Sequence, residues 1–92
     1  MRIQVRTYAR LAEVLGPESE VSVEEDHGIR AVLGVIAGNE EVRIRALFDE
    51  DGEVHDYLII VHNRVRVEHC DLSSVTLCEG DEIAILPPLA GG

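Results

Sequence analysis

Hydrophobic and polar residues alternate at both ends of the chain. Ile3 and Val5 alternate with polar residues over positions 2–7, and residues 82–86 repeat this period of two. Because successive side chains of a strand point to opposite faces, the period is typical of half-buried strands. We expect these two strands to be neighbours in the middle of a sheet. A third alternating segment, residues 21–24, predicts a hairpin partner for the first strand.

Helical spacing appears in two other segments. The main helix is predicted by an apolar stripe at i, i+3, i+4 and i+7, namely Ile29, Val32, Leu33 and Ile36. Gly38 ends this helix, and the acidic residues 24–26 precede it. A shorter helix is predicted between the first two strands by Tyr8, Leu11, Val14 and Leu15. Thr7 is placed to cap the shorter helix, and Gly16 followed by Pro17 ends it.

The second half of the chain indicates strands joined by turns. Residues 57–62 form a continuous apolar run of strand length, so either both faces of this strand are covered or one face is kept for a partner. Residues 65–67 form a short alternating strand. Residues 68–78 are loop-like, and three apolar side chains are expected to hold this loop to the core: Leu72, Val75 and Leu77.

Two segments of the middle of the chain are less regular. Residues 42–48 fit either a strand or a short irregular helix. Residues 49–52, Asp-Glu-Asp-Gly, form an acidic turn. The turn lacks the further ligands and the closing glutamate of a calcium-binding loop, so we interpret it as a plain turn.

These elements predict a single α+β domain over residues 1–92. One mixed sheet would carry the main helix across one face, with the short helix between the first two strands. Apolar residues make up 46% of the chain, with one Phe, two Tyr and no Trp, so the core is expected to be aliphatic. A chain of this length buries roughly 60–70% of its unfolded surface without disulfides.

The formal net charge of −10 narrows the possible partners. Nucleic-acid binders need a basic face, so nucleic acid is excluded as a partner. The charge favours a basic protein partner through long-range attraction, although acidity for solubility alone explains it equally well. No apolar run approaches the ~18 residues of a membrane span, and no leader opens the sequence. We therefore expect a cytoplasmic protein with no membrane partner.

All eight basic residues are arginines. A lysine amine attacks activated acyl groups, whereas an arginine side chain stays protonated and inert. A chain with an activated C-terminal carboxylate would therefore contain no side-chain amine to capture it. A compositional preference for arginine explains the same observation.

The sequence contains no recognisable catalytic or metal-binding pattern. Cys70 and Cys78 are too few for a disulfide scaffold or a cysteine zinc site, and the four histidines show no metal-ligand spacing. Ser-His-Asp, glycine-rich phosphate-loop and HExxH patterns are also missing. We expect no stably bound cofactor, no metal and no catalysis by the chain alone.

The last six residues have an unusual composition. Pro87 and Pro88 end the final strand, because they fix φ and lack backbone donors. Leu89 and Ala90 follow, and then Gly91 and Gly92, whose backbones other groups can approach closely. Two conformationally restricted prolines followed by two glycines without side chains suit a flexible tail, residues 87–92, that enters another protein's active site. A frayed terminus is the alternative.

The order of elements, and the run from Gly80 through Pro87-Pro88 to Gly91-Gly92, resemble the MoaD/ThiS-type ubiquitin-like sulfur carriers. The opening residues 8–16 and the strand end Val61-His62-Asn63 are also similar. The resemblance covers the whole chain. It is greatest to the small subunit of molybdopterin synthase and to small archaeal modifiers. Leu86 is often aromatic in the family, and Arg66 replaces a common apolar contact residue.

The resemblance implies the β-grasp fold and sulfur carriage. An E1-like adenylating enzyme would use ATP to activate the Gly92 carboxylate, with Gly91 beside it, and sulfur would then be carried covalently as a thiocarboxylate. The molybdopterin synthase large subunit would receive the tail, with Leu86, Pro87, Pro88, Leu89 and Ala90 contacting the partner. The chain would be the non-catalytic sulfur donor for the molybdopterin dithiolene.

Three alternatives remain open on the sequence. The chain could be a modifier joined through Gly92 to lysines of target proteins. It could be a carrier for tRNA thiolation or for cysteine or thiamine synthesis, although Pro87-Pro88 favours the thiamine pathway least. It could also be an interaction domain with an inert tail.

A docking face follows from the strand pattern. Leu86 and Ala84, with one side of the 58-60-62 series, are predicted to form an exposed apolar patch opposite the main helix.

Overall fold

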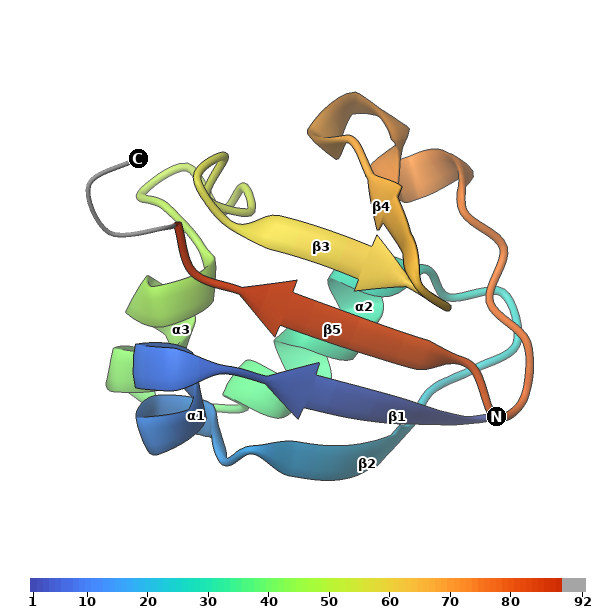
Figure 1. Cartoon of the computed structure of the whole chain (residues 1–92), viewed down its shortest axis with the longest axis horizontal. Helices are drawn as coiled ribbons and strands as arrows, with labels where there is room; N and C mark the ends of the chain where they lie inside the picture. The colour runs from blue at the N-terminus through green and yellow to red at the C-terminus, as the bar shows by residue number, and fades with distance from the viewer. Residues whose placement is uncertain (89–92) are drawn as a thin grey trace.

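A five-stranded mixed sheet is covered on one face by helices, in a computed structural model that describes residues 1–88 (Figure 1). The strands lie in the order β2-β1-β5-β3-β4. Their bounds are β1 Arg2–Thr7, β2 Glu18–Ser22, β3 Ile59–His62, β4 Val65–Val67 and β5 Glu82–Leu86. The helices are α1 Ala9–Leu15, α2 Ile29–Ala37, α3 Glu41–Leu47 and the 3-10 helix η1 His69–Ser74. This is the predicted α+β architecture of the β-grasp fold.

The first and last strands pair in parallel at the centre of the sheet. Val5 lies opposite Ile83 and Thr7 opposite Ile85. β2 pairs antiparallel with β1 on one side, and β3 pairs antiparallel with β5 on the other. β5 is therefore hydrogen-bonded along both edges, which fixes the point where the chain leaves the sheet.

The core lies between this sheet and α2. The four predicted stripe residues of α2 are all buried, and they pack against buried β-branched side chains of the strands: Ile3, Val5, Ile60, Ile83 and Ile85. The segment after β4 was predicted to be a loop, but it contains the 3-10 helix η1. It is held to the core as predicted, since Leu77 is buried and Leu72 and Val75 pack against the cluster. The aliphatic composition thus forms one continuous core.

Several predicted boundaries and contacts were wrong. The second strand runs over Glu18–Ser22 rather than 21–24, because it pairs along almost all of β1. Thr7 belongs to β1, and its hydroxyl donates to the Gly16 carbonyl (2.5 Å) instead of capping α1. Tyr8 takes the N-cap position without a side-chain cap and is exposed, so it is not a core residue of the short helix.

The two less regular segments of the middle of the chain, residues 42–48 and 49–52, adopt a helix and a turn. Residues 41–47 are helical (α3), and their apolar side chains other than Leu47 stay partly or fully exposed. The acidic segment is a turn as predicted. The Asp49 carboxylate accepts hydrogen bonds from the backbone N–H of Asp51 (2.8 Å) and Glu53 (3.0 Å). Gly52 has φ +79°, where glycine is favoured.

Candidate functional site

The tail begins at the end of the central strand. Leu86, the last residue of β5, pairs with Ile59 of β3. Pro87 is partly buried and Pro88 is exposed, and β5 stops before them as predicted. The predicted site residues Leu89, Ala90, Gly91 and Gly92 lie outside the described residues.

One face of the sheet carries no helix and contains an apolar patch. We call Ile59, Val61, Ala84 and Leu86 the open-face patch. Ile59 lies opposite Leu86 and Val61 opposite Ala84 in the β3–β5 ladder, so these side chains share one face. Ile59, Val61 and Leu86 are partly exposed, whereas Ala84 retains 7% exposure.

The predicted composition of this patch was half right. Ala84 and Leu86 belong to it. The series Leu58 and Ile60 does not, because Ile60 lies opposite Ile85 and points with it into the core, where both are fully buried. His62 follows Ile60 on that side. Tyr57 and Leu58 precede β3 rather than forming part of it. Sequence reasoning missed Ile59 and Val61, and only the pairing register identifies them.

A shallow hollow of about 380 Å³ lies on this open face. Val61, Ala84 and Leu86 form its apolar wall. Its polar lining consists of Tyr8, Arg6, Glu82 and Arg64. The hollow therefore adjoins the point where the chain leaves β5.

A ladder of ion pairs crosses the open face beside the patch. Arg6 of β1 bridges Glu18 of β2 (3.5 Å) and Glu82 of β5 (3.3 Å). The hydrogen bond with Tyr8 and the charges of Glu82 and Glu18 raise the pKa of Arg6. The charge of Arg6 is thus compensated within the chain.

The hairpin between β3 and β4 is hydrogen-bonded to residues at the start of β5. His62 Nε2 lies 2.8 Å from Asp81 Oδ2, and this oxygen also accepts the Cys78 backbone N–H (2.9 Å). The Asn63 side-chain oxygen accepts the Glu82 N–H (2.8 Å). The residues of the Val61-His62-Asn63 segment that carried the family resemblance therefore position β5.

Burial and hydrogen bonding shift the pKa of the Asp81 carboxyl group in opposite directions. Burial alone would raise the pKa of its carboxyl group, but hydrogen bonds from the Asn63 and His62 side chains and the Cys78 backbone outweigh it. The pKa of Asp81 is consequently below its ordinary value.

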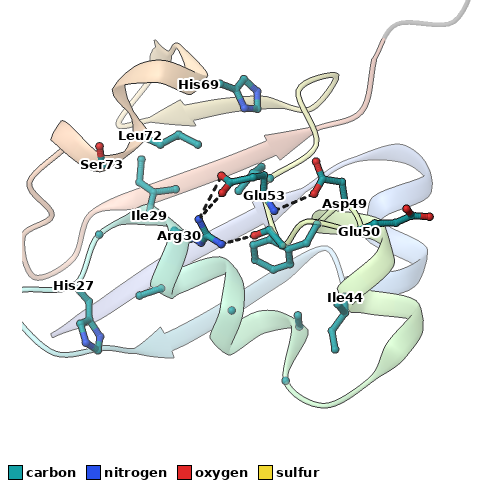
Figure 2. A pocket seen from close by; sticks show the side chains of 18 of the residues that line it. His27, Ile29, Arg30, Ile44, Asp49, Glu50, Glu53, His69, Leu72 and Ser73 are labelled. Carbon is teal, nitrogen blue, oxygen red and sulfur yellow. Dashed lines mark hydrogen bonds and ion pairs between the residues drawn. The ribbon is translucent and has the colours of Figure 1, made fainter.

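A larger open groove of about 1190 Å³ lies on the helix side. It runs between α2, the acidic turn and η1 (Figure 2). Arg30 reaches across it from α2 to the Glu53 carboxylate (3.3 Å) and to the Gly52 carbonyl. The contacts drawn there connect the turn to the helix. Nucleophile–base pairs of the kind that enzymes use are not among them.

The described residues offer no metal site. Residues 1–88 contain no group of three or more His, Cys, Asp or Glu side chains arranged to hold an ion. Cys70 and Cys78 are both exposed free thiols. Among the helices of the described chain, none is both long and apolar enough to cross a membrane.

Comparison with known proteins identifies the family. A model described as the ThiS family matches residues 5–92, which is nearly the whole chain. The chain belongs to the ThiS family. The family resemblance predicted from the tail motif and the order of elements is thereby confirmed.

The relatives of this ThiS-family chain include small archaeal modifiers and a molybdopterin synthase sulfur carrier subunit. The chain is 31% identical to Small archaeal modifier protein 3 of Haloferax volcanii, over 100% of both chains. It is 33% identical to the Molybdopterin synthase sulfur carrier subunit of Aedes aegypti, over 100% of this chain and 90% of the relative. The crystal structure of SAMP1 from Haloferax volcanii superposes with a TM-score of 0.87, at 28% identity and 100% coverage of both chains.

These matches establish a ubiquitin-like member of a family of sulfur carriers and small modifiers, with the predicted β-grasp fold. The cytoplasmic location and the roles of the individual tail residues stay predictions.

Proposed function

We propose that this ThiS-family chain carries sulfur on the carboxylate of Gly92. The observation that carries the proposal is the position of β5: a strand hydrogen-bonded on both sides leads directly into the Pro-Pro segment of a sulfur-carrier family. The two prolines end this strand, because each fixes φ and lacks a backbone donor.

Activation would proceed at the chain end and would need a partner enzyme. The Gly92 carboxylate attacks the α-phosphorus of ATP on an E1-like adenylating enzyme, and pyrophosphate leaves. Hydrosulfide supplied by the partners then attacks the acyl carbon, AMP leaves, and the product is the thiocarboxylate. Glycine suits this step, because its acyl carbon has no side chain to obstruct the incoming sulfur. In this proposal, the described residues form the folded domain that presents the chain end to the partner enzyme.

Intact-mass spectrometry tests the carrier role. The protein purified from its native host should contain a fraction heavier by the difference between one sulfur and one oxygen, located in the C-terminal peptide. A chain lacking Gly91 and Gly92 serves as the control for the position. If every fraction of the native protein has the unmodified mass, the carrier proposal is wrong.

Molybdopterin synthesis is the downstream reaction that we propose. Full-length similarity to a molybdopterin synthase sulfur carrier subunit supports it. The tail would enter the large subunit and deliver sulfur to the dithiolene. Mixing the thiocarboxylated chain with the large subunit and the sulfur-free pterin precursor should yield molybdopterin, and the carboxylate form should yield none.

Conjugation to proteins is the second candidate, and the modifier relatives favour it. Gly92 would form an isopeptide bond with target lysines. A chain without lysine cannot extend such conjugates by modifying its own side chains. An N-terminally tagged chain should then give high-mass adducts that resist reductant. The same tag on a chain lacking Gly91 and Gly92 should give none.

A further inference from the structure

The arginines of the open face differ in how far carboxylates of the described chain compensate their charge. On β1, Arg2 pairs with Glu79 (3.3 Å), and Arg6 pairs with Glu18 and Glu82. Arg64 forms no ion pair with any residue from 1 to 88. Within residues 1–88, Arg66 forms its one ion pair with Glu68, at 3.9 Å, and both side chains are more than 60% exposed.

The two weakly compensated arginines lie beside the patch. Arg64 lines the hollow together with Val61, Ala84 and Leu86. Arg66 lies opposite Val61 in the β3–β4 ladder, so it projects from the same open face. Asn63 and Arg64 form the two-residue turn of this hairpin, both with positive φ (47° and 72°), which holds the backbone of Arg64 in a defined conformation.

Arg64 and Arg66 therefore make the β3–β4 edge of this face locally positive, although the whole molecule is negative. The chain as a whole has a net charge of −10. The border of the open-face patch on the side of the β3–β4 hairpin, near the start of β5, has two cations that carboxylates of residues 1–88 compensate little or not at all. A partner that covers the patch removes water from both guanidinium groups. Such burial is unfavourable unless the partner supplies carboxylates. A basic surface would meet like charge here.

We propose that the adenylating enzyme contacts the open face with an apolar surface that bears carboxylates opposite Arg64 and Arg66. This inference rests on the proposed activation of Gly92, a step common to sulfur carriage and conjugation. An aliphatic or aromatic side chain of the enzyme fills the hollow against Leu86 and Val61. Its flanking Asp or Glu residues pair with the two arginines. The expectation from net charge alone, a basic partner, is reversed at this face.

Charge-reversal variants distinguish an effect of the local charge on the open face from an effect of the net charge of the whole molecule. Arg64→Glu and Arg66→Glu each change the net charge by two units on the open face. Arg45→Glu makes the same change on α3, where Arg45 is exposed and pairs with Glu41 four residues away. Arg64→Lys keeps the charge. Thermal unfolding of each variant verifies that the fold is retained.

The readout is ATP–pyrophosphate exchange by the E1-like enzyme of the same genome, measured as a function of carrier concentration. We expect Arg64→Glu to raise the KM for the carrier about tenfold with little change in kcat, as for loss of an interfacial charge pair. Arg66→Glu should act in the same direction. Arg64→Lys and Arg45→Glu should stay within about twofold of the wild type.

Two results overturn the inference, and only the second also contradicts the proposed function. If Arg64→Glu lowers KM, or changes it no more than Arg45→Glu does, the enzyme presents no carboxylate at this face, although activation itself stands. If the wild-type chain supports no exchange at all, the proposed activation is wrong and the inference is lost with it.

Discussion

At the scale of single residues, the Asp81 carboxylate joins the end of β3 to the turn before β5. It accepts hydrogen bonds from His62 at the end of β3 and from the backbone of Cys78 before β5. Asn63 hydrogen-bonds to the backbone of the next residue, Glu82. The hydrogen bonds that the Asp81 carboxylate itself accepts favour its ionised form, so its folded-state pKa lies below the value of 3.8 that it has when unperturbed.

Replacing Asp81 by Asn should remove a pH-dependent contribution to stability. Because the folded pKa is depressed, the contribution is fully present above the unfolded pKa and is lost as the pH falls through the folded pKa. At pH 7 we expect Asp81→Asn to lower the free energy of unfolding by about 1–3 kcal/mol.

The difference between the two proteins should shrink as the pH is lowered below about 4, the ordinary carboxyl range. Urea unfolding of both proteins from pH 7 to pH 2.5 measures it. A difference that stays constant across this range would show that the Asp81 charge is irrelevant. Asp56→Asn, at an exposed carboxyl before β3, is the control.

Two glycines of α2 should respond oppositely to alanine. Gly34 lies inside the helix, and an added Cβ meets nothing within 4 Å, so Gly34→Ala should stabilise the fold by about 1 kcal/mol. Gly38 ends the helix with φ +56°, where a Cβ is strained, so Gly38→Ala should destabilise it by about 1–2 kcal/mol. Thermal unfolding should shift by several degrees in each direction. Shifts of the same sign would contradict a helix that ends at Gly38 with positive φ.

At the scale of elements, the strongly periodic segments were predictable and the weakly periodic ones were not. The stripe of α2 and the alternation of β1 have one buried face each, and burial of that face decides the structure. In β5, Ile83 and Ile85 face the core, and Ala84 on the other face is nearly buried as well. In α3, most apolar side chains are not buried, so no face was selected by the sequence pattern. Its helical structure depends instead on packing against α1 and α2.

The candidate site, too, was predictable only where the sequence pattern is distinctive. The tail motif located the exit from β5, because proline and glycine act through local backbone geometry. The patch required the β3–β5 register, which pairs Ile59 with Leu86 and places Ile60 in the core. In a run where every residue is apolar, a shift by one position leaves the pattern unchanged and exchanges the faces. The sequence alone therefore left this face undetermined.

Leu86→Asp tests the open face as a docking element. Leu86 is partly exposed at the end of β5, so an aspartate there can remain solvated in the free chain. We expect affinity for the adenylating enzyme to fall about tenfold or more, because docking would bury the new charge against apolar groups. Calorimetry or the KM for the carrier measures this loss.

Val42→Asp provides the matched control for Leu86→Asp. Val42 is 68% exposed in the first turn of α3, where the helix dipole favours an acidic side chain. The fold should be retained in both variants and docking lost only in Leu86→Asp. Equal affinity of the two variants would remove the open face from consideration as the docking surface.

At the scale of the whole molecule, acidic residues outnumber basic ones by 18 to 8. The ion pairs described above are largely exposed, and exposed pairs contribute about 0–1 kcal/mol each. The excess acidic charge acts over longer distances and opposes the compact state. Long-range repulsion is screened by salt more completely than contacts between neighbouring side chains.

Added salt should therefore stabilise this protein. The Debye length falls from about 30 Å at 0.01 M to about 10 Å at 0.1 M, comparable to the molecular radius of gyration of 12.2 Å, so most of the repulsion is screened in this range. We expect the unfolding temperature at pH 7 to rise with NaCl. The rise should be smaller after Glu24→Gln and Glu25→Gln, which reduce the net charge from −10 to −8 at two exposed positions. An unfolding temperature that falls with NaCl would mean that the ion-pair ladder on the open face outweighs the net charge.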